Sequence, residues 1–314
     1  MSGASGFIGR ELVKCLKAAG ADPLVVSSGR STGYKGASEA KGSRLDDPIY
    51  WFEALCQASA EDLVLFHLAA QTSAKVAAQH PELEARASRS ISDALVNAIR
   101  DYRQGRPNVR VHVVYTSTAT VYGRSPRLPV NELCPTSICS DYDQHKIDFE
   151  LSLREGADQA WFGLTILRLP NVYGSFVDRT SSDRGVLERW IKDAASGRPI
   201  VSYGGGNFLR DYLHVSDLCG LMTKVDYCDI QTAEIFNPGT GVGVTIREAQ
   251  ELIVKEVFDR VGTLSHIVNE PFPADSILID HRDYVADVGK TRDFFGWHAK
   301  RSIRDEIGVM VREL

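Results

Sequence analysis

The chain has 314 residues, of which 43% are hydrophobic and 25% are charged, as in globular proteins rather than disordered or fibrous ones. Its formal charge of −5 argues against a nonspecific nucleic-acid binder, because such proteins concentrate positive charge. The six cysteines include no C-x-x-C pair, which predicts reduced thiols rather than a metal site or a disulfide framework. Since no apolar run reaches the length of a membrane span, we expect a cytoplasmic protein without a membrane partner.

The N-terminal stretch MSGASGFIGREL has the glycine spacing of a loop that holds a phosphate at the start of a helix. The apolar pattern Leu12, Val13 and Leu16 places that helix immediately after Gly9. The alternative is a plain turn before a surface helix, because many turns use glycine for a positive φ. If the loop binds a dinucleotide, the expected contacts come from Gly3, Ser5, Gly6, Phe7, Ile8 and Gly9.

A phosphate-binding loop normally follows a buried strand, but here Met1 and Ser2 alone precede Gly3. In a doubly wound sheet the first strand is central, so its absence leaves two strands with unpaired backbone groups. We therefore expect the natural protein to begin upstream, with a short apolar segment ahead of Ser2. The alternative is that another segment of the chain pairs in that position.

Apolar runs and helical patterns alternate along the first half of the chain, which predicts an α/β fold with a Rossmann-type, doubly wound parallel sheet. The expected strands are 23–28, 62–70, 109–118 and 162–170. The expected helices are 9–20, 82–105 and 141–156, each ending at a glycine. We place a dinucleotide-binding domain at 1–170 plus about 211–236, and a smaller, discontinuous substrate domain at about 171–210 plus 237–314.

The end of the second strand decides which dinucleotide fits. A carboxylate there holds the adenosine ribose and rejects a 2′-phosphate, but this chain has Ser27, Ser28, Gly29 and Arg30. Arg30 can pair with a 2′-phosphate, so the segment slightly favours NADP over NAD; the alternative is an ordinary exposed loop arginine. Asp46 is expected either to contact the adenine edge or to cap the next helix.

A tyrosine, a lysine and a threonine form a candidate catalytic set. Tyr142 and Lys146 are four residues apart in SDYDQHKIDFEL, so a helix places them on one face. A nearby ammonium lowers the pKa of a tyrosine, which would let Tyr142 act as a general base. Thr118 ends an apolar run, at the edge where ligands of open α/β sheets bind. The alternatives are a chance surface pair and an ordinary turn threonine.

Together these stretches resemble the extended short-chain dehydrogenase/reductase family, in particular its nucleotide-sugar epimerases, dehydratases and ketoreductases of the NAD-dependent epimerase/dehydratase type. The resemblance covers nearly the whole chain, and several motifs in the family's order are more specific than any one of them. The motifs are SGASGFIG, FHLAAQTS, YTSTATVYG, YDQHK, LRLPNVYG, GGGNFLRDYLHVSDL, FNPGTGVGVTIREAQELI and YVADVGKTRDFFGW.

The resemblance implies that Tyr142 is the acid/base, that Lys146 holds the nicotinamide ribose, and that Thr118 orients the reacting oxygen. It implies further cofactor contacts from Leu68, Ala69, Ala70 and Pro170, and contacts to a nucleotide-diphosphate sugar from Asn171, Arg210 and Arg282. Arg282 is expected to replace an arginine that related epimerases carry at the position of Ile277. Asp217 is expected to cap a helix rather than to catalyse.

The first functional reading is an NAD(P)-dependent nucleotide-sugar 4-epimerase. Ala119 and Thr120 stand where similar dehydratases carry an Asp-Glu pair, which disfavours dehydration. The alternatives are an NADPH-dependent 4-ketoreductase of a keto-deoxy-sugar nucleotide and a catalytically silent dinucleotide-binding protein. The resemblance also implies a homodimer formed through helices at about 82–104 and 141–155.

Overall fold

The computed structural model describes residues 1–26, 44–58, 60, 62–70, 81–125, 127–174, 185–225, 232–274, 276 and 278–314. The chain divides into two compact units. Unit 1 comprises Met1–Val121, Ile138–Arg168 and Cys219–Phe236, and unit 2 comprises Tyr122–Ser137, Leu169–Leu218 and Asn237–Leu314. Among the described residues, no helix combines the length and the apolar character that crossing a membrane requires.

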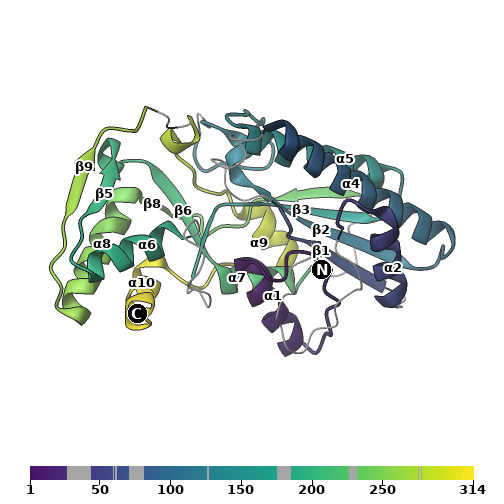
Figure 1. Cartoon of the computed structure of the whole chain (residues 1–314), viewed down its shortest axis with the longest axis horizontal. Coiled ribbons are helices and arrows are strands. Elements are labelled where there is room, and N and C mark those ends of the chain that lie inside the picture. The colour runs from purple at the N-terminus through teal and green to yellow at the C-terminus, as the bar shows by residue number, and fades with distance from the viewer. Residues whose placement is uncertain are drawn as a thin grey trace. The chain divides into compact units, whose positions relative to one another are not determined.

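Unit 1 is built on a sheet with the strand order β1-β2-β3-β7, in which β1 pairs parallel with β2, and β3 pairs parallel with β7 (Figure 1). The strands are β1 (Asp62–His67), β2 (Arg110–Thr118), β3 (Gly163–Leu169) and β7 (Ala233–Phe236). Of the four expected strands, those at 62–70, 109–118 and 162–170 are confirmed, although β1 ends at His67. In the fourth, Val26 forms a parallel bridge to Ser2, and residues 27 and 28 lie outside the described residues. Strand β7 was not predicted, because four residues are too short a run to show a pattern.

Helices cover this sheet as a doubly wound fold requires. Helices α4 and α5 lie side by side along one face, and α2 packs against α4 (Figure 1). The helices are α1 (Phe7–Ala18), α2 (Pro48–Ala58), α4 (Pro81–Gln104) and α5 (Asp141–Asp158), with a 3-10 turn at Ala119–Tyr122. Helix α7 (Val215–Met222) begins in unit 2 and ends in unit 1. The predicted parallel α/β class is confirmed, whereas the homodimer stays a prediction.

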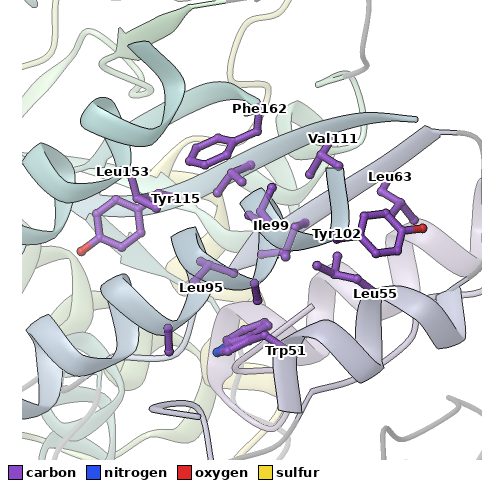
Figure 2. Close-up of a cluster of buried hydrophobic side chains, with 14 of the residues drawn as sticks. Trp51, Leu55, Leu63, Leu95, Ile99, Tyr102, Val111, Tyr115, Leu153 and Phe162 are labelled. Atoms are coloured by element: carbon purple, nitrogen blue, oxygen red, sulfur yellow. The ribbon is translucent and has the colours of Figure 1, made fainter. Parts of the chain in front are cut away.

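A core cluster of unit 1 lies between the sheet and helices α2, α4 and α5 (Figure 2). Helix α2 contributes Trp51 and Leu55, and helix α4 contributes Leu95, Ile99 and Tyr102, all buried. The apolar face of α4 therefore repeats every three or four residues, which is the spacing of one side of a helix. Side chains of β1, β2 and α5 and the residue before β3 also belong to the cluster, among them Leu63, Val111, Tyr115, Leu153 and Phe162.

Two predicted helix limits were wrong, one of them for a packing reason. Helix α1 begins at Phe7, not after Gly9. Helix α5 continues through Gly156 to Asp158 instead of ending at this glycine. A Cβ at Gly156 would lie 2.8 Å from the Phe162 ring and 3.1 Å from Val96, so the glycine lets α5 approach its neighbours closely. Gly20, by contrast, follows α1 with a φ of 84°, as a helix-terminating glycine does.

Unit 2 is built from two small sheets and four helices within its described residues. Strands β4 (Asn171–Tyr173), β6 (Leu209–His214) and β8 (Gly243–Thr245) form one sheet, and β5 (Ile200–Tyr203) pairs parallel with β9 (Ile267–Glu270), as Figure 1 shows. The helices are α6 (Val186–Ala195), α8 (Ile246–Val261), α9 (Gly289–Phe295) and α10 (Ile303–Arg312), with 3-10 turns at Gly204–Gly206 and Leu278–His281. Thr245 and Glu248 form a capping box that starts α8. A core cluster joins α6, α8 and α10 through Trp190, Ile253 and Ile307.

A two-residue strand lies at the edge of β1. The Ser2 N–H donates to Phe66 O at 2.9 Å, and the Val26 N–H donates to Met1 O at 2.8 Å. Ser2 therefore bridges in parallel to His67 on one side and to Val26 on the other. An apolar cavity of about 490 Å³ lies next to Met1, between the two flanking segments. Its lining residues include Leu24, Leu63 and Trp51.

The amino group of Met1 ends this short strand inside the protein. Its nitrogen donates to Leu24 O at 2.6 Å, in the position of the next bond of a parallel ladder. Burial lowers the pKa of this ammonium to about 5. A peptide N–H at that position makes the same bond without an ionisable group.

We expect that a short run of β-branched apolar residues added before Met1 stabilises unit 1, because the run extends the ladder and fills the cavity. Burying one or two such side chains contributes about 2 kcal/mol or more, which raises Tm by roughly 4–8 °C. Differential scanning calorimetry measures the shift, with a Gly/Ser extension of equal length as the control. Equal Tm values for the two extensions would contradict the prediction.

Candidate active site

The glycine loop of unit 1 packs against the chain that follows β1. Gly3 has a φ of 75°, and a Cβ there would lie 2.7 Å from the backbone of both Leu68 and Ala69. A Cβ at Gly9 would lie 2.1 Å from Gly3 O. Both glycines therefore form a cradle that side chains would fill, at the start of a helix whose first N–H groups have no intrahelical partner.

The second predicted cofactor segment lies beside this loop. The Leu68 N–H donates to Ser2 O at 3.3 Å, and the Ala69 N–H donates to Ser2 Oγ at 3.4 Å. Because these bonds hold 68–70 next to Ser2 and Gly3, the structure brings together two segments more than 60 residues apart in sequence. Both lie at the carboxyl end of the parallel strands, where dinucleotides bind in such sheets.

The structure describes only some of the residues that were expected around the adenosine ribose. Ser27, Ser28, Gly29 and Arg30, which favour NADP, lie outside the described residues. Asp46 is exposed and pairs with Arg44, with Nη2 and Oδ2 3.2 Å apart. It does not cap α2: Asp47 Oδ1 accepts the Ile49 N–H at 2.9 Å, so the predicted cap was wrong by one residue. The adenine contact of Asp46 stays a prediction.

Helix α5 brings the tyrosine and the lysine to the end of β2. Lys146 Nζ donates to Thr116 O at 2.8 Å and lies 5.9 Å from the centre of the Tyr142 ring. It also lies 5.0 Å from the centre of the Tyr115 ring, within the range of a cation–π contact. The predicted shared face of Tyr142 and Lys146 is thus directed at the residues that lead to Thr118.

The Lys146 ammonium is buried, with 6% of the residue exposed. Burial lowers its pKa to about 8, and the negative charge of Glu150 opposes this shift. Glu150 lies one helical turn further along α5, on the same face. The ammonium is therefore held where removal from water destabilises it and a buried carboxylate compensates in part.

Glu150 is a candidate site residue that the sequence analysis did not name. Its carboxylate accepts from the Ser117 hydroxyl and forms a two-pronged ion pair with Arg168, at 3.1 Å from Nε and 2.7 Å from Nη2. Both members of the pair are buried, which is rare unless charges are paired. The signal in the sequence was a glutamate one turn after Lys146, but nothing local identified Arg168 as its partner.

The rings of His67, Phe149 and Tyr115 form a stack, and Lys146 lies over the Tyr115 ring. The Phe149 ring centre lies 4.9 Å from that of His67 and 4.7 Å from that of Tyr115. Burial lowers the pKa of His67 to about 3, so its ring is neutral at physiological pH. His67 Nδ1 lies 2.9 Å from Ser2 Oγ, which links the stack to the start of the glycine loop.

The Thr118 hydroxyl belongs to a chain of hydrogen bonds that ends at a carboxylate. Thr118 Oγ1 lies 2.9 Å from Thr120 Oγ1, and the Thr120 hydroxyl donates to Asp143 Oδ1. Asp143 is fully buried, and its Oδ2 accepts from Ser140 Oγ at 2.8 Å. The sequence analysis missed Asp143, although a carboxylate directly after Tyr142 in the first turn of α5 was a signal.

In unit 2, the predicted substrate residues lie on neighbouring elements. Asn171 in β4 pairs in register with Tyr212 in β6, the strand that also carries Arg210. Arg210 is buried and donates to the carbonyls of Arg282, at Nη1, and of Asp280, at 3.0 Å from Nη2. The Arg282 guanidinium is buried too and lies 5.8 Å from the centre of the Tyr284 ring. Ile277, the position where related epimerases carry an arginine, lies outside the described residues. Pro170, a predicted cofactor contact, is buried directly before β4.

Two aspartates of unit 2 hold loops. Asp217 does not cap α7: its Oδ2 accepts the N–H groups of Lys300 at 2.9 Å and Arg301 at 2.8 Å, so the predicted cap was wrong. Asp211, which the sequence analysis missed, accepts from Thr240, from the Gly241 N–H and, at 3.2 Å, from the Ala286 N–H. Burial raises the pKa of Asp211, and these donors oppose the shift.

Known proteins resemble this chain over almost its whole length. A UDP-glucose 4-epimerase of Mycolicibacterium smegmatis is 28% identical over 326 residues, covering 99% of this chain and 96% of the relative. UDP-glucuronic acid decarboxylase 5 of Arabidopsis thaliana is 25% identical over 327 residues, covering 99% of this chain and 87% of the relative. The solved structure of a Thermotoga maritima UDP-glucose 4-epimerase with UDP-glucose has a TM-score of 0.85 at 24% identity. The match covers 99% of this chain and 96% of that chain, and it shows that the two proteins share a fold.

The family model for the NAD dependent epimerase/dehydratase family matches residues 1–237, which include the glycine loop, Thr118, Tyr142 and Lys146. This match spans well over half of the 314 residues. The chain is therefore an enzyme that belongs to the NAD dependent epimerase/dehydratase family.

Proposed function

We propose that this enzyme is a nucleotide-sugar 4-epimerase that oxidises a ring carbon and then reduces it from the opposite face. The observation that carries the proposal is the convergence of α5 on the end of β2, where Lys146 contacts Thr116 and the Thr118 hydroxyl reaches Asp143 through Thr120. A protein that merely binds a dinucleotide has no chemical need for an acid/base tyrosine beside a buried ammonium. A bound nicotinamide would supply a reversible hydride acceptor.

The residues of unit 1 have distinct roles in this proposal. Tyr142 takes and returns the proton of the reacting hydroxyl, and Thr118 orients that oxygen. Lys146 holds the nicotinamide ribose, and its charge favours the phenolate of Tyr142. The backbone cradle at Gly3 and Gly9 and the neighbouring segment 68–70 hold the dinucleotide, with Ser5, Gly6, Phe7 and Ile8 at the start of α1.

The residues of unit 2 bind the nucleotide sugar in this proposal. Arg210 and Arg282 are buried cations, and burial lowers the pKa of Arg210. A diphosphate would offset the cost of burying two guanidinium groups, because it accepts charge-assisted hydrogen bonds from their planar forks. Asn171, on the strand beside that of Arg210, contributes a neutral donor and acceptor.

The cofactor and the reaction direction are tested together by releasing the bound nucleotide. We expect the denatured protein to release NAD in a near-stoichiometric amount, since an epimerase regenerates its cofactor in every cycle. Mass spectrometry identifies the nucleotide, and an assay with UDP-glucose and UDP-galactose measures epimerisation. A protein without bound nucleotide that reduces a 4-keto sugar with NADPH would instead be the alternative ketoreductase, and would agree with the NADP preference predicted from Ser27–Arg30.

Replacing Tyr142 by Phe tests the acid/base assignment. We expect Tyr142→Phe to lower kcat by about 10²–10⁴-fold, because the hydroxyl that exchanges the proton is lost while the ring remains. Cofactor affinity should stay within a few-fold of the parent's. Steady-state kinetics and fluorescence titration measure the two quantities, with the exposed Tyr203→Phe as the control. Parent-like turnover of Tyr142→Phe would remove Tyr142 from the mechanism.

Lys146 costs folding stability, which is expected of a residue retained for function. Its pKa in the folded protein, about 8, is below the unfolded value of 10.5, so the unfolded state binds more protons between these values. The contribution of Lys146 to the stability of the folded parent is therefore least unfavourable above pH 10.5 and becomes more unfavourable as the pH is lowered towards about 8. At neutral pH, burying the Lys146 ammonium lowers the free energy of unfolding by about 3 kcal/mol.

We expect Lys146→Met to be more stable than the parent at pH 7 but inactive. The gain is about 1–2 kcal/mol, because losing the bond to Thr116 O offsets part of the relieved burial cost. Urea unfolding at pH 7 and pH 10 measures the difference, which should shrink at the higher pH. The exposed Lys224→Met is the control, and a variant less stable than the parent at pH 7 would contradict the argument.

A further inference from the structure

Two cysteines from distant parts of the chain meet inside unit 1. Cys15 lies in the last turn of α1, and Cys219 lies in α7, at the residue where the chain re-enters unit 1. The Cys15 and Cys219 thiols hydrogen-bond to each other, and Cys219 Sγ lies 3.7 Å from Ile8 O. Ile8 and Cys15 are separated by two helical turns, so Cys219 packs along one face of α1 (Figure 1).

The two thiols differ in their exposure to solvent. Cys219 is fully buried, whereas Cys15 is partly exposed, and both are free thiols in this structure. A reagent in solution therefore meets Cys15, and a group bonded to Cys15 Sγ lies directly beside Cys219. This order of access suits a pair in which one cysteine reacts first and the other resolves the product.

The hydrogen bond between the thiols decides which one is the nucleophile. The Cys219 S–H has two acceptors within reach, Ile8 O and Cys15 Sγ. Turned to Cys15, it stabilises a thiolate there and lowers the pKa of Cys15 to about 7; burial and the charge of Glu11 oppose this shift, and the charge of Lys14 favours it. The same hydrogen bond and burial raise the pKa of Cys219. Cys15 is therefore the nucleophile at neutral pH, because thiolates rather than thiols attack disulfides.

We propose that Cys15 and Cys219 form a thiol–disulfide exchange site, at which a low-molecular-weight disulfide ties α1 reversibly to α7. In the first step the Cys15 thiolate attacks one sulfur of the small disulfide, whose S–S bond breaks and releases one small thiolate. That thiolate takes the proton of Cys219 and becomes a thiol. In the second step the Cys219 thiolate attacks Cys15 Sγ and releases the other half of the reagent as a thiolate.

The exchange balances without any other reactant. One protein thiolate, one protein thiol and one small disulfide give one protein disulfide, one small thiol and one small thiolate. Two electrons pass from the cysteine sulfurs to the small disulfide, and an excess of small thiol reverses both steps. While the protein disulfide is closed, Ile8 O loses the Cys219 donor, and the helix that follows the glycine loop is covalently fixed to α7.

Oxidised glutathione is the probe that tests this site in the folded parent. The reduced protein is incubated with it at neutral pH without denaturant, the remaining thiols are alkylated, and mass spectrometry maps the proteolytic peptides. We expect the loss of two of the six thiols and a disulfide-linked peptide pair that contains Cys15 and Cys219. Dithiothreitol should restore all six thiols.

Three variants separate the two roles. Cys219→Ser should stop at a mixed disulfide with one glutathione on Cys15, and its hydroxyl can still donate to Ile8 O. Cys15→Ser should leave Cys219 as a thiol, because solvent does not reach the buried sulfur. Cys56→Ser is the control: Cys56 is also partly exposed but contacts the Arg106 guanidinium, at 3.6 Å from Nη2, and its loss should leave the Cys15–Cys219 peptide pair unchanged.

The parent alone can overturn the inference, even if a variant does not fold. Cys15 and Cys219 that both remain thiols after prolonged incubation would overturn the exchange site, and so would glutathione that stays on Cys15 of the parent. A peptide pair that joins Cys15 to a different cysteine would overturn the assignment of Cys219. None of these measurements uses a nucleotide sugar, so their outcome is independent of the proposed function.

Discussion

The hydrogen bond from Lys146 Nζ to Thr116 O organises the candidate site of unit 1. A buried ammonium is tolerated when polar partners surround it, and here a carbonyl, the face of Tyr115 and the charge of Glu150 provide them. Because Lys146 lies in the second turn of α5, its bond to β2 draws the first turn of the helix to the same strand end. Asp143 consequently reaches Thr120, and Thr118 is held through it.

Three buried carboxylates hold segments that the backbone alone would not connect. Glu150 joins α5 to β3 through Arg168, and Asp143 joins α5 to the turn after β2. In unit 2, Asp211 gathers the N–H groups of Gly241 and Ala286 from two other segments. An ionised carboxylate offers several acceptor sites and no donor, so each one orders every hydroxyl or N–H that contacts it. In this protein, that ordering extends to the polarity of hydroxyls at the site.

The start of the chain links the packing of unit 1 to its glycine loop. Ser2 bonds to both flanking segments, and its hydroxyl lies beside His67, below the aromatic stack that supports Lys146. The glycine loop begins at the next residue, with Gly3 against the backbone of Leu68 and Ala69. A two-residue strand therefore positions the loop, while an apolar cavity lies in line with it.

The sequence by itself determined the features that depend on local spacing. Continuous apolar runs located β2 and β3, and a helical period located α4. The four-residue spacing placed Tyr142 and Lys146 on one face, because helix geometry alone sets that relation. The order of motifs was sufficient for the family, since its matched region, residues 1–237, includes the motifs from SGASGFIG to GGGNFLRDYLHVSDL. Gly3 and Gly9 were recognised for the same reason, as positions that a local turn requires.

Tertiary structure alone decided which polar groups became partners. Arg168 meets Glu150, and Ala286 meets Asp211, across separations that no local pattern measures. Gly156 looked like a helix end but lies within α5, because Phe162 and Val96 pack against it. Asp143 looked like an ordinary first-turn aspartate, and burial beside Thr120 made it part of the site. Burial of a charge depends on whether distant donors compensate for lost water, and strand pairing and helix packing decide which donors arrive.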